Sequence, residues 1–295
     1  MSVPSDRRPI VAGVDPDPGK RMALAWAADE AARRRVPLRL VLAEGVPTTG
    51  YRGSRDLPSW EEWNRTRHVA GEAALKSAVD FVEARQPGTE VSGTLAEGDP
   101  VWLLGEQSKD ASAVVLGSWH LSRRRGLMSR ASVALPVLAH SHCPVVVVPE
   151  PEHVTQEPAY VVVGVDGSEH SVAAVDLAFE EAALRGARLR ALYVWSPGLL
   201  GVMDEAAARL EGRRLLSEIV AGRGAACPDV ELRHELVSGH PVEKLAEASE
   251  HALALVVGSR GRGGFAGMLL GSVSQGVLRH AHCPVIVVPR GAGPA

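Results

Sequence analysis

The second half of the chain alternates short apolar runs, rich in valine and leucine, with longer stretches of helical character. Strands that are apolar along their whole length and alternate with helices are typical of a parallel sheet covered on both faces. The pattern therefore predicts a doubly wound α/β domain, in which ligands bind beyond the carboxyl ends of the strands. The expected strands span 160–165, 189–195, 230–237, 253–258 and 284–288, and the expected helices span 171–185, 204–221, 241–251 and 272–281. The expected apolar face of helix 204–221 consists of Leu210, Leu215, Ile219 and Val220.

This arrangement is repeated along the chain. The segment HSHCPVVVVP at 140–149 returns as HAHCPVIVVP at 280–289, with eight of ten positions identical. The openings match as well, because IVAGVD at 10–15 corresponds to VVVGVD at 161–166. We therefore interpret the chain of 295 residues as two tandem copies of one domain. The copies are placed at 1–149 and 159–295, with a proline-rich linker at 150–158.

The first copy is about ten residues longer than the second. Asp166 lies 151 positions after Asp15, whereas Gly239 lies only 141 positions after Gly98. We assign the extra residues to 45–63, where glycine, proline, serine and threonine predict a loop. Its tryptophans, Trp60 and Trp63, are expected either to pack locally or to contact a partner.

Composition and charge exclude several classes of protein. Lysine and arginine number 32 and aspartate and glutamate 35, a net charge of −3 that argues against a basic nucleic-acid-binding protein. Three cysteines provide no disulfide framework and fit a reducing compartment. The polar start has no signal-peptide core, and no apolar stretch approaches the roughly 20 residues of a membrane span. We expect a cytoplasmic protein that binds neither nucleic acid nor membrane.

A glycine-rich segment, GSRGRGGFAGMLLGS at 258–272, follows the fourth expected strand of the second copy. Glycines let backbone N–H groups approach an anion closely, and Ser272 stands where the N-cap of the next helix is expected. A helix N-terminus attracts phosphate, and Arg260 and Arg262 add positive charge. The segment predicts a phosphate-binding loop, although glycine richness alone also fits an ordinary surface loop.

Two better-known nucleotide motifs nearly match and are rejected. GRGGFA at 261–266 fits the dinucleotide fingerprint, but no acidic residue follows Glu250 and the glycines follow the fourth strand rather than the first. GVDPDPGK at 13–20 is similar to a P-loop, but five residues separate its glycines. In addition, Arg21 replaces the serine or threonine that would hold Mg²⁺.

The spacing of Gly258, Gly261 and Gly271-Ser272 is the G-2x-G-9x-G-[S/T] signature of the universal stress protein family, which the chain resembles. VGVDGS at 163–168 and CPVIVVP at 283–289 are also similar to that family, and the match covers both halves. The resemblance implies a tandem universal stress protein with a five-stranded parallel sheet in each copy. It further implies binding of ATP or another adenine nucleotide, with or without Mg²⁺, dimerisation through the last strand and induction under stress.

The resemblance implies a role for each matching residue. Asp166 would contact the nucleoside, and Val194 would pack against adenine beside Val165. A carboxylate accepts hydrogen bonds from hydroxyls but repels phosphate, so Asp166 belongs near ribose or base; capping the turn before Gly167 is the alternative. The residues expected around the phosphates are Gly258, Arg260, Gly261, Arg262, Gly271, Ser272, Val273 and Ser274.

The first copy departs from this pattern. Gly117 is present, but His120 and Ala131 replace the second and third glycines, and ten residues rather than nine precede Ala131-Ser132. Ala43-Glu44 stands where the second copy has Val194-Trp195. We expect one good nucleotide site in the second copy and a weakened or lost site in the first. The remaining candidates in the first copy are Asp15, Gly117 and Ser132.

The sequence contains no evident nucleophile–base pair and no carboxylate pair on a metal-binding loop. Binding of ATP without a positioned water or base gives at most slow hydrolysis, so no catalytic residue is assigned and enzymatic activity is left open. The leading hypothesis is an ATP-binding regulator or sensor of the stress response, whose nucleotide occupancy biases a loop or a partner. A slow, autophosphorylating ATPase and a nucleotide-independent scaffold are the alternatives.

Histidine and cysteine recur together at 140–143 and 280–283. Their position at a helix end, before a buried strand, favours capping and packing, so no metal site is expected and Cys143 and Cys283 are predicted to be buried thiols. The apolar strands 145–148 and 285–288 would be pairing templates if they lay on sheet edges. Pairing of the two halves, or of two chains in a homodimer, would cover them, and the sequence identifies no other protein partner.

Overall fold

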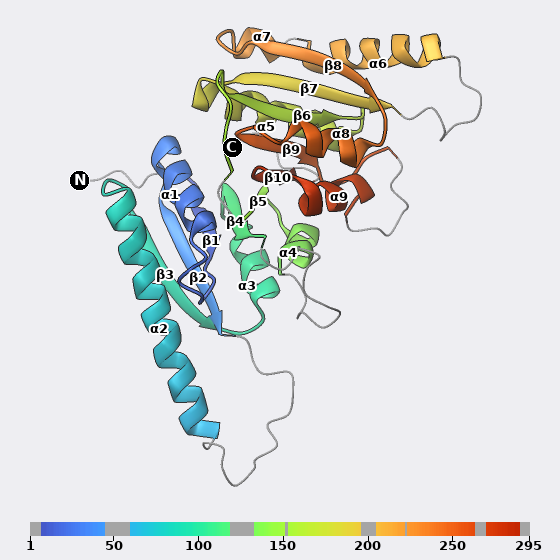
Figure 1. Ribbon diagram of the computed structural model, residues 1–295. Coiled ribbons are helices and arrows are strands. Elements are labelled where there is room, and N and C mark those ends of the chain that lie inside the picture. The colour runs from blue at the N-terminus through green and yellow to red at the C-terminus, as the bar shows by residue number, and fades with distance from the viewer. Residues whose placement is uncertain are drawn as a thin grey trace. The chain divides into compact units, whose positions relative to one another are not determined.

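The computed structural model describes residues 7–44, 60–118, 133–150, 153–195, 205–221, 223–262 and 270–289. Contacts between residues divide the chain into two units, Met1–Gly117 (unit 1) and Ser118–Ala295 (unit 2), and each is described by itself. Both alternate strands with helices around a mainly parallel sheet (Figure 1). This arrangement confirms the α/β class predicted from the apolar pattern.

The described strands of unit 1 form a parallel sheet in the order β3-β2-β1-β4. The first strand is central and its residues 10–12 are buried, with Ile10 paired to Leu38 on one side and to Ala113 on the other. The strands are β1 (Ile10–Gly13), β2 (Leu38–Glu44), β3 (Val91–Glu97) and β4 (Ala113–Gly117). The described helices are α1 (Met22–Arg34), α2 (Trp60–Arg85) and α3 (Pro100–Gln107).

Helix α2 begins inside the segment that the sequence predicted as a loop. Residues 60–63 are helical, so that part of the prediction is wrong, and residues 45–59 lie outside the described part of the chain. Glu61 and Glu62 occupy the first turn, where negative side chains favour a helix start. The prediction extended the loop too far because it rested on the glycine and proline content of the preceding residues, and Trp60 itself does not mark either a loop or a helix start.

The strands of unit 2 follow the order β5-β10-β9-β6-β7-β8, with β5 antiparallel to β10 and the other pairs parallel. Helices α5 and α6 cover one face of this sheet, and α8 and α9 cover the other (Figure 1). The strands are β5 (Val145–Val148), β6 (Tyr160–Val165), β7 (Arg188–Trp195), β8 (Leu232–Ser238), β9 (Ala254–Gly258) and β10 (Val285–Val288). The helices are α4 (Ala134–His140), α5 (Glu169–Arg185), α6 (Glu205–Val220), α7 (Arg223–Ala226), α8 (Pro241–Ala248) and α9 (Ser272–His280).

Local chemistry explains where the helices begin and end. The Ser168 hydroxyl caps α5 by accepting from the backbone N–H of Ser171, and Gly186 ends that helix with φ 59°, a left-handed conformation that glycine adopts readily. Proline stands at the first turn of α8, as predicted. Leu210 was wrongly placed on the apolar face of α6, since its side chain is 72% exposed. The face that packs inward follows the spacing i, i+3, i+4, i+7 and i+8. Its members are Gly212, Leu215, Leu216, Ile219 and Val220.

The two apolar strands 145–148 and 285–288 pair with each other, which is one of the two pairings considered from the sequence. Val146 of β5 lies opposite Ile286 of β10, and β10 also pairs with β9. Both edges of β10 are therefore occupied within one chain, so this strand offers no edge to a second chain. Because of this pairing, β5 belongs to unit 2, and the boundary between the units that follows from residue contacts lies after Gly117. The sequence repeat places a domain boundary at 149, and that boundary stays a prediction.

The three cysteines differ in accessibility. Cys143 and Cys283 are buried, as predicted, whereas Cys227 is half-buried, and none of the three forms a disulfide. Burial raises the pKa of the Cys283 thiol to about 12. None of the helices in the described residues is long and apolar enough to cross a bilayer.

These environments predict selective alkylation of the native protein. Thiolate is the reactive form, so iodoacetamide at neutral pH should label Cys227 and leave Cys143 and Cys283 unlabelled until the chain unfolds. Mass spectrometry of peptides from native and urea-unfolded samples measures the labelling at each site. Rapid labelling of Cys283 in the native protein would contradict the buried environment.

Candidate functional site

The predicted ligand residues of unit 2 gather at the carboxyl end of its sheet. Asp166 directly follows β6, and residues 259–262 follow β9. Because β6 and β9 are adjacent parallel strands, with Val163 opposite Val256, their ends meet at the same edge. The structure therefore brings together the acidic residue and the start of the glycine-rich loop, which are almost 100 positions apart in sequence.

Both carboxylate oxygens of Asp166 accept backbone hydrogen bonds. Oδ1 accepts from the N–H of Ser168 at 2.9 Å, and Oδ2 accepts from the N–H of Arg262 at 3.0 Å. The first bond closes the turn after β6, which was the alternative role considered for this residue. The second bond holds the glycine-rich loop against that turn. Asp166 therefore joins two segments of the site while its remaining lone pairs can accept further donors.

Glycine is required where the loop approaches this turn. A Cβ atom on Gly261 would lie 2.3 Å from Oδ2 of Asp166. Gly167 has φ 84°, a left-handed conformation, and a Cβ there would lie 2.7 Å from Nη2 of Arg262. The guanidinium of Arg262 consequently lies over the turn after β6, so its positive charge is placed at the edge of the sheet.

The other end of the loop leads into α9. Gly271 is the N-cap of this helix, so Ser272 is its first helical residue and the predicted N-cap at Ser272 was one position off. No side chain among the residues that the structure describes caps this end, so the N–H groups of the first turn have no described side-chain acceptor and suit a ligand. The buried Ser274 hydroxyl donates to the carbonyl of Gly258 at 2.7 Å and so ties the helix to the end of β9. Ser272 is exposed and Val273 half-buried.

The strand register separates two residues expected to lie together. Val165 is paired with Tyr193, so Val194, the next residue along β7, belongs to the opposite face by the pleat of the strand. Tyr193 faces α6, since a Cβ on Gly212 would lie 3.1 Å from its ring. Val165 and Val194 therefore both lie near the carboxyl end of the sheet but on different faces.

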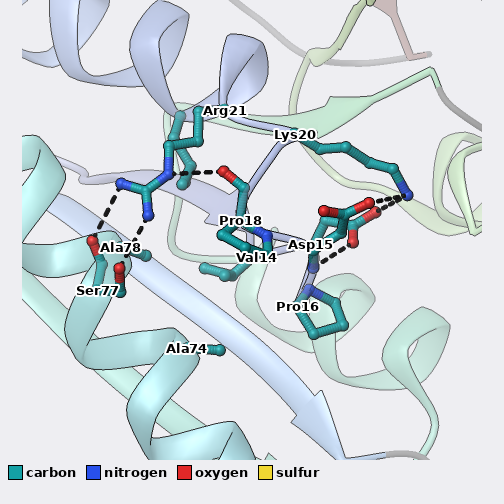
Figure 2. Close-up of a pocket in the computed structure, with 11 residues that line it drawn as sticks. Val14, Asp15, Pro16, Pro18, Lys20, Arg21, Ala74, Ser77 and Ala78 are labelled. Carbon is teal, nitrogen blue, oxygen red and sulfur yellow. Dashed lines mark hydrogen bonds and ion pairs between the residues drawn. The ribbon is translucent and has the colours of Figure 1, made fainter.

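Unit 1 has a different arrangement after its first strand (Figure 2). Asp15 accepts from the N–H of Asp17 at 2.9 Å, and Lys20 Nζ lies 3.4 Å from Asp15 Oδ2. Lys20 corresponds to Ser171 of unit 2, so this lysine brings a positive charge that the second unit lacks at that position. The adjoining cavity, which Asp15 lines together with Arg21 and Ser77, has a volume of about 20 Å³, room for roughly one water molecule.

The end of β2 also differs from its counterpart in unit 2. Glu44 stands where unit 2 has Trp195, and its side chain is buried against α2. Its Oε2 lies 3.2 Å from Nδ1 of His68, and its Oε1 has no hydrogen-bond partner among the described residues. This hydrogen bond raises the pKa of His68, and the charges of Glu44, Glu72 and Glu97 act in the same direction. The described part of unit 1 thus carries a buried carboxylate at the end of β2, next to Ala43, the counterpart of Val194.

Of the two remaining predicted site residues of unit 1, the structure describes Gly117. Gly117 ends β4, and among the described residues a Cβ there would meet only Ala23 Cβ, at 4.0 Å. Ser132 lies outside the described residues, as do His120 and Ala131. The sequence reading missed the Asp15–Lys20 and Glu44–His68 pairs. A charged residue closing a mostly apolar strand, as Glu44 does, was the available signal.

The histidines considered as metal ligands have structural partners. His140 Nδ1 lies 2.8 Å from the carbonyl of Pro136, within α4, and the backbone N–H of His282 donates to the hydroxyl of Ser249. Within the described ranges, no three His, Cys, Asp or Glu side chains converge as a metal site would require. These contacts agree with the capping and packing roles favoured by the sequence.

Comparisons with known proteins agree with the geometry. The universal stress protein family model matches residues 6–149 and again residues 160–289. The chain is 36% identical over 289 residues to Universal stress protein Rv2623 of Mycobacterium tuberculosis, covering 94% of this chain and 95% of the relative. It is also 36% identical over 301 residues to Universal stress protein Rv2005c of that organism, covering 97% and 99%. A crystal structure of a universal stress protein from Archaeoglobus fulgidus shares the fold, with a TM-score of 0.72 at 21% identity over 97% of this chain and 98% of that chain.

The Glu44–His68 pair predicts a pH-dependent contribution to stability. The pKa of folded His68 lies above its unfolded value of about 6.5, so the contact stabilises fully below that pH and is lost as the pH rises through the raised pKa. His68→Gln should therefore destabilise the protein more at about pH 6 than at about pH 9 in urea unfolding. His234→Gln, on an exposed residue of β8, is the control. A deficit for His68→Gln that is constant across this range would contradict the assignment.

Proposed function

This chain belongs to the universal stress protein family, and we propose that unit 2 binds ATP or another adenine nucleotide at the carboxyl ends of β6 and β9. The observation that carries the proposal is the loop held by Asp166 beside the uncapped start of α9. Uncapped N–H groups at a helix start, which carry about half a positive charge, suit phosphate oxygens. Arg260 and Arg262 follow β9 at the same edge and supply formal positive charge.

The proposed orientation of the nucleotide follows from charge. The phosphates lie along residues 258–262 and the first turn of α9, where donors and cations gather. Asp166 has lone pairs left for a ribose hydroxyl or an exocyclic amine, and a phosphate there would be repelled. A magnesium ion, if bound, would be held mainly by the phosphates, since the described residues offer no cluster of three metal-ligating side chains.

The proposed role is that of a nucleotide-dependent regulator in the stress response, acting in the cytoplasm. In the described part of the site the Ser259 hydroxyl contacts Nδ1 of His170 at 3.3 Å, but Ser259 is buried. The groups proposed to face the nucleotide are donors and cations, which favours binding over chemistry. Occupancy would bias the conformation of the loop that Asp166 and Ser274 hold at its two ends. A slow ATPase remains the competing function, and release of ADP from bound ATP over hours distinguishes it from a sensor that retains ATP.

We further propose that unit 1 binds nucleotide weakly or not at all. The Lys20 ammonium already accompanies Asp15, which removes part of the free acceptor capacity. Glu44 places a carboxylate where unit 2 has an aromatic residue, and a buried carboxylate disfavours the packing of an uncharged base. A stoichiometry of one nucleotide per chain follows.

A matched pair of glycine substitutions tests the site. A Cβ on Gly258 would lie 2.7 Å from His170 Cβ and 2.8 Å from its backbone carbonyl, whereas a Cβ on Gly117 would meet no described atom closer than 4.0 Å. Isothermal titration with ATP should therefore show one site per chain, weakened at least about tenfold (about 1.4 kcal/mol) by Gly258→Ala and unchanged by Gly117→Ala. Circular dichroism controls for folding of both variants. Two equal sites per chain, or an equal loss in both variants, would overturn the assignment to unit 2.

A further inference from the structure

We infer that His170 is a positioning residue for the phosphate-binding loop, linking the first turn of α5 to both ends of that loop. This inference rests on the proposed nucleotide site of unit 2 and assigns a role to a residue that the glycine signature does not include. His170 is the second residue of α5 and lies directly behind the end of β9. It does not need to touch the nucleotide to control where the loop lies.

The first turn of α5 meets the start of the loop at three places. His170 Nδ1 and Ser259 Oγ share a hydrogen bond of 3.3 Å. The backbone and Cβ of His170 lie so close to Gly258 that only glycine fits there. The Ser168 hydroxyl also lies 3.5 Å from the carbonyl of Arg260, to which it donates. The loop thus leaves β9 along a surface formed by 168–170.

Ser259 passes this contact on to the far end of the loop. Its carbonyl accepts from the N–H of Gly271 at 2.8 Å and lies 3.4 Å from the hydroxyl of Ser274. Its own N–H donates to the carbonyl of Val288 in β10 at 2.8 Å. Ser259 is buried, so it has little freedom to change these partners. A shift of Ser259 would therefore move Gly271, the N-cap of α9, and with it the N–H groups proposed to bind phosphate.

Unit 1 lacks the equivalent of this link. The repeat aligns His170 with Gly19, which has no side chain, and Gly258 with Gly117, where a Cβ would meet no described atom closer than 4.0 Å. Ser118 occupies the position of Ser259, so the serine is present in both units but the histidine only in unit 2. This difference matches the proposed difference in nucleotide binding between the units.

Substitutions at His170 and Ser259 separate positioning from general packing. Loss of one hydrogen bond in His170→Ala should weaken ATP binding roughly three- to tenfold. His170→Asn should restore most of the affinity, because the asparagine side chain places a hydrogen-bonding atom near the position of Nδ1. Ser259→Ala should weaken binding by a similar factor. The double variant should be no weaker than either single variant, since both remove the same bond. His280→Ala, on an exposed residue at the end of α9, is the control.

The dissociation constants are measured by isothermal titration with ATP on the full chain, and thermal unfolding confirms that each variant is folded. Unchanged affinity in His170→Ala would overturn the inference while leaving the nucleotide site intact. Additive losses in the double variant, or no recovery in His170→Asn, would also overturn it, because a residue that only packs would behave in that way. Absence of ATP binding by the unaltered protein would instead refute the proposed function.

Discussion

The two hydrogen bonds accepted by Asp166 are the interaction on which the site of unit 2 depends. One bond closes the turn after β6 and the other holds the loop after β9, so a single carboxylate joins two segments from adjacent strands. The close approach makes glycine necessary at 167 and 261, because side chains there would collide with Leu215, Arg262 or Asp166. The glycine-rich motif therefore reflects the packing of the loop against its own fold as well as the space needed by phosphate.

The carboxyl edge of the sheet carries different charged side chains in the two units. In unit 2 the described residues present two arginines and an open helix start. In unit 1 an ammonium lies beside Asp15 and a buried carboxylate ends β2. In both copies of the repeat the first strand lies between the second and the fourth, so these differences in charge arise on the same α/β framework. Duplication allows this difference because one copy can lose its ligand contacts while its sheet remains stable.

Much of the fold could be predicted because it follows from periodicity and from the repeat. Valine-rich strands, the end of α5 at Arg185, and the meeting of Asp166 with the glycine loop all follow from local patterns combined with the strand-end rule. The exposure of Leu210 was misjudged because the packing of neighbouring elements, and not the residue type, decides which face of a helix is buried. The start of α2 was misjudged because the glycine and proline residues before it suggested a longer loop. The pairs His170–Ser259 and Glu44–His68 could not be predicted, since each joins segments whose approach depends on helix placement. The spacing of residues within a motif carries no information about such contacts.

The antiparallel pairing of β5 with β10 has a consequence for dissection of the chain. Residues 145–148 supply the hydrogen-bonding partner for one edge of an entirely apolar strand, VIVV at 285–288. Within one polypeptide this partner is present at a high effective concentration that does not change on dilution. A fragment beginning after residue 149 would keep the complete glycine signature but expose that edge to solvent. Two such fragments could cover each other only by association, so the fragment's state would depend on its concentration, whereas the intact chain carries its own partner strand.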